Sequence, residues 1–187
     1  MGEVVVVESL TLDGVMQAPG GADEDRRGGF PHGGWARPYA DDVAPEGMGA
    51  DGAMLFGRRT YEQFHGFWSA QTDGNPYTEV LNRKHKYVAS RGALPWVNSS
   101  RLEGDVAAAV AALKREVVGD LVVLGSGELV RSLDAAGLVD VYRLSIHPLV
   151  LGTGARLFAD GAFRRLRLTG SVTTTTTGVV IAAYRPA

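Results

Sequence analysis

The sequence predicts an α/β fold: a mixed, mostly parallel sheet with helices on both faces and an antiparallel hairpin at its carboxyl end. Short apolar segments rich in β-branched residues alternate along the chain with segments of helical periodicity, which is typical of such a sheet. The last part of the chain differs, because two strand-like segments follow one another at 165–172 and 178–184. The threonine run 173–177 between them suits one arm of a hairpin.

Five predicted strands precede the hairpin. Two of them, 53–57 and 121–125, are apolar at nearly every position, as expected of strands that are covered on both faces. The other three are also apolar and rich in β-branched residues, and they lie at 4–9, 86–90 and 141–147.

Two helices are predicted between these strands. In 105–119, apolar residues recur at spacings of four, three and four along one helical face. Asp105 is expected to cap the start of this helix and Gly119 its end. A second helix is expected over 127–137, where a glycine again ends the segment.

The segment 19–52 does not follow the alternation of strands and helices. It holds nine glycines and four prolines, and a loop of this length inside a compact domain is usually functional or disordered. The aromatic residues Phe30, Trp35 and Tyr39 within it favour an ordered flap. The chain is therefore predicted to form one domain, 1–187, with a Gly/Pro-rich flap.

Composition excludes several classes of protein. The formal net charge of −2 gives no electrostatic reason to expect a nucleic-acid or membrane partner, and no apolar stretch approaches the roughly 18 residues of a membrane span. The absence of cysteine excludes thiolate metal sites, and the four scattered histidines lack ligand spacing, so no metal is expected. The amino-terminal segment does not have the pattern of a signal peptide, which favours a cytoplasmic protein.

The end of the second strand carries residues that suit a phosphate. In open α/β sheets, ligands bind outside the carboxyl ends of strands. Arg58 and Arg59 follow Gly57 there, and Thr60 has the capping-box spacing to Gln63, so a helix is expected to begin at Thr60. A helix start offers free N–H groups, and guanidinium groups add fixed donors. The alternative is a capped helix beside two solvated arginines.

Two further strand ends have similar chemistry. Ser90 and Arg91 lie at the end of the third strand, and their alternative interpretation is an ordinary surface loop. The sequence GSG (125–127) follows the fourth strand, and Ser126 is a candidate cap for the next helix. It is not the dinucleotide fingerprint, because Val130 stands where the third glycine belongs, and a tight turn is the alternative.

Five segments occur in an order that resembles the dihydrofolate reductase superfamily. They are SLTLDGVMQAPG, LFGRRTYEQF, YVASR, LVVLGSGELVRSL and GLVDVYRLSIHPLVLGTGARLF. The chain is most similar to the branch that contains the reductase domain of bacterial riboflavin-biosynthesis deaminase–reductases, over roughly residues 3 to 185. The resemblance implies a single-domain, three-layer dihydrofolate reductase-like fold that binds NADPH.

The resemblance also implies roles for particular residues. Arg58 would contact the 2′-phosphate of NADPH, Thr60 would face the pyrophosphate, and the segment from Asp13 to Met16 would border the nicotinamide. The complete set of cofactor-binding residues that it implies is Val15, Met16, Gly57, Arg58, Arg59, Thr60, Ser90, Arg91, Gly125, Ser126, Gly127, Glu128 and Leu129.

The implied reaction is hydride transfer from NADPH to a small heterocyclic (pteridine- or pyrimidine-like) or carbonyl substrate. Asp13 and Asp41 are the candidate catalytic acids, with Asp42 as a further one, although Asp13 precedes a glycine and also suits a turn. Trp35 and Tyr39 are the candidate substrate-binding residues. The residues between Trp35 and Asp41 do not match the pteridine-binding pattern of true dihydrofolate reductases, which disfavours folate.

Two other interpretations stay open. One is a catalytically silent nucleotide-binding module of the same fold, since the proton donor is not identified. The other is a structural, dimer-forming domain, for which the apolar segment 145–152 is a candidate surface of a homodimer.

Overall fold

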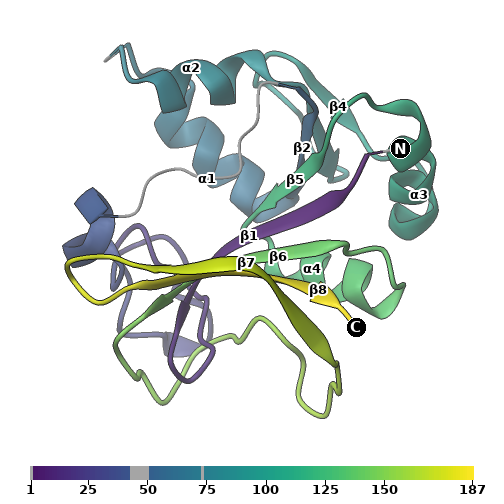
Figure 1. Cartoon of the computed structure of the whole chain (residues 1–187). Coiled ribbons are helices and arrows are strands. Elements are labelled where there is room, and N and C mark those ends of the chain that lie inside the picture. The colour runs from purple at the N-terminus through teal and green to yellow at the C-terminus, as the bar shows by residue number, and fades with distance from the viewer. Residues whose placement is uncertain (1, 43–50, 73) are drawn as a thin grey trace. The chain divides into compact units, whose positions relative to one another are not determined.

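The computed structural model describes residues 2–42, 51–72 and 74–187 (Figure 1). The chain forms two compact units. Unit 1 comprises residues 1–6 and 47–140, and unit 2 comprises residues 7–46 and 141–187. Strand β1 (Val4–Thr11) begins in unit 1 and continues in unit 2. The single domain stays a prediction.

Unit 1 contains four further strands and the four α-helices of the described chain. The strands are β2 (Ala53–Gly57), β3 (Lys86–Ala89), β4 (Ser99–Arg101) and β5 (Leu121–Leu124). The helices are α1 (Arg58–Trp68), α2 (Pro76–Arg83), α3 (Val106–Glu116) and α4 (Gly127–Ala135). Among the described helices, none is long and apolar enough to cross a membrane.

Unit 2 contains the rest of β1, the strands β6 (Val141–His147), β7 (Leu166–Thr174) and β8 (Val180–Pro186), and two 3-10 turns, η1 (Arg27–Gly29) and η2 (Arg37–Asp42). The strand order is β4-β3-β2-β5-β1-β6-β8-β7. β2 pairs in parallel with β3 and β5, whereas β8 pairs antiparallel with β6 and β7. The predicted α/β class with a carboxyl-terminal antiparallel hairpin is confirmed.

Helices cover both faces of the strands of unit 1. The connection from β2 to β3 and the connection from β4 to β5 run in opposite directions across the sheet. Because such parallel crossovers are right-handed, their helices must lie on opposite faces. Figure 1 shows α1 and α2 on one side of these strands and α3 on the other. β2 and β5 are accordingly buried at nearly every position, as their apolar sequences predict.

The structure corrects the predicted start of α1. The helix begins at Arg58, and its N-cap is Gly57, whose extended backbone (φ −76°, ψ 158°) leads directly into the first turn. Thr60 is thus the third helical residue, and the predicted capping box is wrong. The local pattern failed because Gly57 already provides the N-cap conformation without a side chain.

α3 matches its predicted start but not its predicted end. Asp105 accepts a hydrogen bond from the N–H of Ala108 (2.8 Å), as a cap should. The helix ends at Glu116, and Gly119 lies beyond it with φ +84°. A Cβ at Gly119 would stand 2.6 Å from the N atom of Gly52, so this glycine permits a close backbone contact instead of ending the helix.

The sequence interpretation missed α2 and β4. α2 carries ordinary start signals, because Asn75 accepts the N–H of Tyr77 (2.9 Å) and Pro76 is the first helical residue. β4 is only three residues long and has the polar sequence SSR, so neither length nor hydrophobicity marks it as a strand.

Aromatic residues of the predicted flap pack inside unit 2. Phe30 and Trp35 are buried together with Val15 and Ala18 in one apolar cluster of unit 2. The indole N–H of Trp35 donates a hydrogen bond to the carbonyl of Gln17 (2.7 Å). This packing agrees with an ordered flap, which stays a prediction, and residues 43–50 lie outside the described residues.

The threonine run belongs to the hairpin, as predicted. Thr173 and Thr174 are the last residues of the pairing between β7 and β8, where they face Ile181 and Val180. Thr175 begins the turn, and its side-chain oxygen accepts the N–H of Val179 (3.0 Å).

A buried lysine supports the connection from α2 to β3. The side chain of Lys86 is fully buried, and its amine lies 4.5 Å from the centre of the Trp96 ring. The amine donates to the carbonyl oxygens of Lys84 (2.8 Å), Val97 (3.2 Å) and Asn82 (3.3 Å). Burial lowers the pKa of Lys86 to about 8.

Lys86 should make the stability of the protein rise with pH above about pH 8. Its folded pKa lies below the ordinary lysine value of 10.5, so between these values the unfolded chain binds more protons and the free energy of unfolding increases with pH. The slope from this group is at most about 1.4 kcal/mol per pH unit. Urea unfolding of wild type and Lys86→Met across this range measures it. Equal slopes in the two proteins would contradict the assignment.

Candidate functional site

The carboxyl ends of four parallel strands lie along one edge of unit 1. β2 pairs in parallel with β3 and β5, and β3 pairs in parallel with β4. The last residues of β2 and β3, Gly57 and Ala89, are direct partners in this register. The structure therefore brings together the predicted phosphate-suited residues that follow these strands: Gly57, Arg58, Arg59, Thr60, Ser90, Arg91, Gly125, Ser126, Gly127 and Glu128.

A hydrogen bond ties the loop after β5 to the end of β2. The N–H of Gly57 donates to the side-chain oxygen of Ser126 (2.7 Å). Ser126 is the N-cap residue of α4, but its left-handed backbone (φ 68°) directs no side-chain bond to that helix. The prediction that the Ser126 side chain caps α4 is therefore wrong, because this hydroxyl accepts the N–H of Gly57 at the end of β2 instead.

Glycines permit this close approach between the end of β2 and the loop after β5. A Cβ at Gly57 would lie 3.2 Å from the side chain of Ser126. Gly125 has φ +67°, and a Cβ there would lie 3.2 Å from Cγ2 of Thr60. The first turns of α1 and α4 are thus held side by side, with backbone N–H groups at both helix starts.

Both arginines at the start of α1 are paired with carboxylates. Arg58 lies 3.1 Å from Glu62 within the helix, and Arg59 lies 3.3 Å from Glu128 in the first turn of α4. All four side chains are about half exposed or more. Such exposed pairs contribute only about 0.2–1 kcal/mol each, so an incoming phosphate could replace the carboxylates at small cost.

The turn after β3 is supported by an arginine that the sequence interpretation missed. The hydroxyl of Ser90 accepts the N–H of Gly92 (3.0 Å), and the guanidinium of Arg101 donates to the carbonyl of Gly92 (2.8 Å). Arg101 is the last residue of β4, and Arg91 is exposed on the same turn. Because β4 was not predicted, nothing marked Arg101 as a neighbour of this strand end.

Three of the predicted cofactor residues are buried. Leu129 is packed in unit 1 on the inner face of α4. Val15 and Met16 are buried in unit 2, where the N–H of Val15 donates to the hydroxyl of Thr11 (3.0 Å). Their side chains contribute to packing in the structure described.

Asp13 is held as an anion that fixes two loops of unit 2. Its carboxylate accepts hydrogen bonds from the hydroxyl of Thr11 (2.5 Å) and from the N–H groups of Gly152 (2.8 Å) and Leu151 (3.2 Å). These bonds, the one from Thr11 foremost, lower the pKa of Asp13. A carboxylate stabilised in this way is a poor proton donor, so the geometry supports the turn interpretation of Asp13.

The predicted substrate aromatics pack on a histidine. The rings of Trp35 and Tyr39 both meet the ring of His147 edge to face, with centroids 5.1 and 5.2 Å apart. His147 is buried, and its Nδ1 lies 3.0 Å from the carbonyl oxygen of Ser145. His147 therefore packs between the two aromatic rings and the backbone of β6. For Asp41 and Asp42 the structure describes the backbone alone, so the predicted roles of their side chains lie outside the described part of the chain.

A buried glutamate in β1 was also missed. Glu8 is almost completely buried, and burial together with the nearby Glu24 raises the pKa of its carboxyl well above the usual value. A lone acid inside the valine-rich segment VVVVESL was the available signal.

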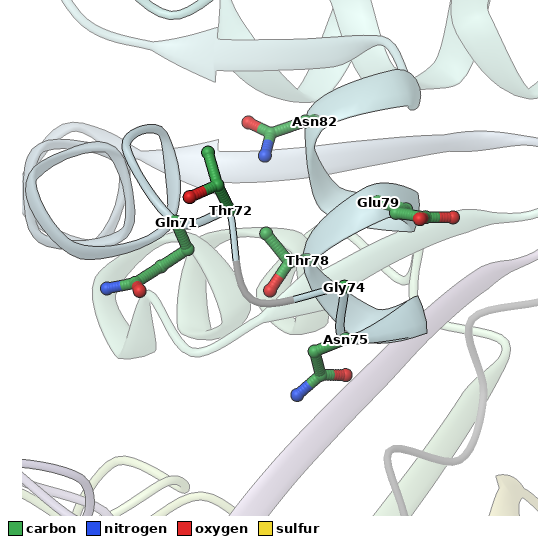
Figure 2. Close-up of a pocket in the computed structure, with 7 residues that line it drawn as sticks. All are labelled: Gln71, Thr72, Gly74, Asn75, Thr78, Glu79 and Asn82. Atoms are coloured by element: carbon green, nitrogen blue, oxygen red, sulfur yellow. The ribbon is translucent and has the colours of Figure 1, made fainter.

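A pocket in unit 1 lies apart from the predicted site residues. Over residues 2–42, 51–72 and 74–187, no three His, Asp or Glu side chains come together as a metal site. A pocket of about 360 Å³ is lined by α2 and by residues that precede it (Figure 2), and none of the predicted site residues lines it. Its lining is Gln71, Thr72, Gly74, Asn75, Thr78, Glu79 and Asn82.

Several known proteins are similar to this chain in sequence or in fold. YyaP of Bacillus subtilis (strain 168), an uncharacterised protein, is 27% identical over 161 residues, which are 84% of this chain and 80% of that protein. A solved structure from Shewanella sp. PV-4, assigned to riboflavin biosynthesis, has a TM-score of 0.69 at 16% identity and covers 99% of both chains. Dihydrofolate reductase from Enterococcus faecalis, complexed with NADP(H) and RAB-propyl, has a TM-score of 0.57 at 12% identity and covers 99% of this chain and 96% of its own.

These solved structures confirm the predicted dihydrofolate reductase-like fold. The family model of the RibD C-terminal domain matches residues 3–181, which is nearly the whole chain. The match confirms the superfamily and the branch that the motifs resemble. The chain belongs to the RibD C-terminal domain family.

Proposed function

We propose that the protein is an NADPH-dependent reductase that transfers a hydride to a C=N or C=O group of a small heterocyclic or carbonyl substrate. The observation that carries the proposal is the edge of unit 1 at which the parallel strands β2, β3, β4 and β5 end. Two helix starts, glycines and several arginines lie together at this edge. An edge of this kind suits a ligand that carries several phosphates.

The residues of this edge fit the phosphates of NADPH. A 2′-phosphate is a dianion, and Arg58 and Arg59 offer forked N–H donors with carboxylate partners that are exposed and weakly held. The loop 125–127 approaches the start of α1 closely enough to present backbone N–H groups to a pyrophosphate. Membership of the RibD C-terminal domain family, and the NADP(H) complex of the Enterococcus faecalis enzyme, support the same cofactor.

The chain's own residues would bind and orient, while the bound nicotinamide supplies the hydride. Arg58 would hold the 2′-phosphate and thereby select NADPH over NADH. In unit 2 we propose that Val15 and Met16 border the nicotinamide and that Trp35 and Tyr39 contact the substrate. Asp13 would position its loops, since its hydrogen bonds favour the ionised form.

Four further properties belong to the same proposal. The protein would act in the cytoplasm and on a small molecule, and the net charge of −2 does not favour nucleic acid. Two copies would pair through the segment 145–152, in which Val150 is exposed.

Paired titrations of the purified protein with NADPH and with NADH test the proposal. The fluorescence of the reduced nicotinamide reports binding without any knowledge of the substrate. NADPH should bind more tightly, because NADH lacks the phosphate that Arg58 would hold.

A further inference from the structure

The sheet of unit 2 has an open edge along strand β7. β7 is the last strand in the sheet order, so it pairs with β8 on one side and with no strand of the described chain on the other. The regular part of its pairing runs from Leu166 to Thr169, and an irregularity follows before Thr173. An open strand edge presents unpaired N–H and C=O groups, to which a further strand can bind.

The outward backbone groups of this edge belong to Leu166 and Leu168. The N–H of Ala187 donates to the carbonyl of Arg165 (3.0 Å), which makes Arg165 a hydrogen-bonded position of the ladder. Such positions alternate along an antiparallel pair, so Leu166 and Leu168 direct their N–H and C=O groups away from β8. Pro186, the partner of Leu166, has no N–H to donate, as this alternation requires. Two bonding positions are thus available to an added strand.

Arginine side chains alternate with the two leucines along this edge. Arg165 and Arg167 are both exposed, and neither is paired with a carboxylate in the described part of the chain. Arg167 stands directly opposite Arg185 on β8, and like charges at such positions repel each other. Residues 161–187 contain four arginines and no lysine, aspartate or glutamate, whereas the whole chain has a net charge of −2. The edge is therefore a basic surface on an acidic protein.

These arginines disfavour a second copy of the chain as the added strand. If two β7 strands paired antiparallel about Arg167, the two Arg167 side chains would face each other. If they paired about Leu166, each Arg165 would face an Arg167. A pairing about Leu168 would extend into Gly170, whose φ of +72° does not fit a regular strand. The same positive charges attract a strand with acidic residues at the facing positions.

We propose that the β7 edge, residues 165–169, binds an extended acidic segment of a partner protein as an added antiparallel strand. The residues of that segment opposite Arg165 and Arg167 are aspartate or glutamate, and the residue opposite Leu168 is apolar, because directly opposed side chains share a face of the sheet. Leu168 is 46% exposed and offers that apolar contact. The β7 edge lies within unit 2 and shares no residue with the proposed cofactor and substrate sites.

A short fluorescent peptide in which glutamate alternates with valine tests the proposal. We would measure its binding to the full chain by fluorescence anisotropy, beside control peptides. One has lysine in place of glutamate, one has the same residues in two blocks, and one is N-methylated at each valine. The alternating acidic peptide should bind at least about tenfold more tightly than each control. N-methylation removes the N–H donors that would face Leu166 and Leu168 but keeps every charge, so it separates strand pairing from charge attraction.

Arg167→Glu is the informative variant of the protein. It reverses the charge that the peptide meets, and it places an acid opposite Arg185, so the fold should be kept. The alternating acidic peptide should lose about tenfold in affinity, and the lysine peptide should gain about as much. Arg115→Glu makes the same charge change at an exposed position of α3 in unit 1. It should leave both affinities within about twofold of wild type.

Amide hydrogen exchange of the wild-type protein tests the geometry without any substitution. The N–H groups of Leu166 and Leu168 should exchange more slowly when the acidic peptide is bound, whereas the N–H of Arg167 is bonded to β8 in both states. No binding of the acidic peptide, protection of other amides only, or unchanged binding by Arg167→Glu would overturn the proposal. Equal binding of the alternating and block peptides would also overturn it, and would assign the arginines to a general surface for anionic polymers such as nucleic acid.

Discussion

Arg58→Ala should weaken NADPH binding by about 10- to 100-fold and leave NADH binding almost unchanged. A charge-assisted bond to a phosphate contributes about 1.5–3 kcal/mol, and NADH lacks the phosphate that Arg58 would hold. The substitution should be mild for the fold, because alanine suits the first turn of α1 and the lost pair with Glu62 is half exposed.

Fluorescence titration of both nucleotides measures this effect, with Arg115→Ala as the control. Arg115 is an exposed arginine in the last turn of α3, away from the strand-end edge. It should change neither affinity. If Arg58→Ala lowered both affinities equally, or if Arg115→Ala had the same effect, Arg58 would not read the 2′-phosphate.

Gly125→Ala should lower both stability and NADPH affinity, the second by about tenfold or more. Gly125 has φ +67°, a conformation that costs a residue with a Cβ about 1–2 kcal/mol. Its Cβ would also lie 3.2 Å from Cγ2 of Thr60, a contact tight enough that we expect the loop after β5 to shift away from the start of α1. That shift would move the N–H groups proposed to hold the pyrophosphate.

Gly137→Ala provides a matched control for the backbone effect. Gly137 has nearly the same conformation, φ +66°, but a Cβ there would meet nothing within 4 Å. Urea unfolding should reveal a loss of about 1–2 kcal/mol in this variant, with NADPH affinity unchanged. Equal losses of NADPH affinity in both variants would mean that the loop after β5 has no special role in binding.

The sequence was informative where hydrophobicity alone decides the structure. β2 and β6 have the predicted bounds. In β2 a run of buried apolar residues leaves few alternatives. The start of α1 failed because Thr60 and Gln63 form a local pattern, whereas the actual geometry depends on Gly57 and on Ser126, 69 residues away in the chain. A pattern within four residues cannot report such a distant partner.

The sequence likewise predicted some residues of the candidate site and missed others. The strand-end rule placed Arg58 and Ser90 at one edge, since parallel strands end together whatever their connections. Arg101 was missed because its strand is short and polar. Glu8 was missed because sequence cannot tell a buried acid from one that faces solvent at the same strand position. Only the fold supplies the burial that changes its chemistry.

The central claim is that unit 1 binds NADPH through its 2′-phosphate. The paired titration of the unsubstituted protein with NADPH and NADH tests it most directly, because the two nucleotides differ only in that phosphate. We predict that NADPH binds about 10- to 100-fold more tightly than NADH. Equal affinities, or no binding of either nucleotide, would contradict the claim.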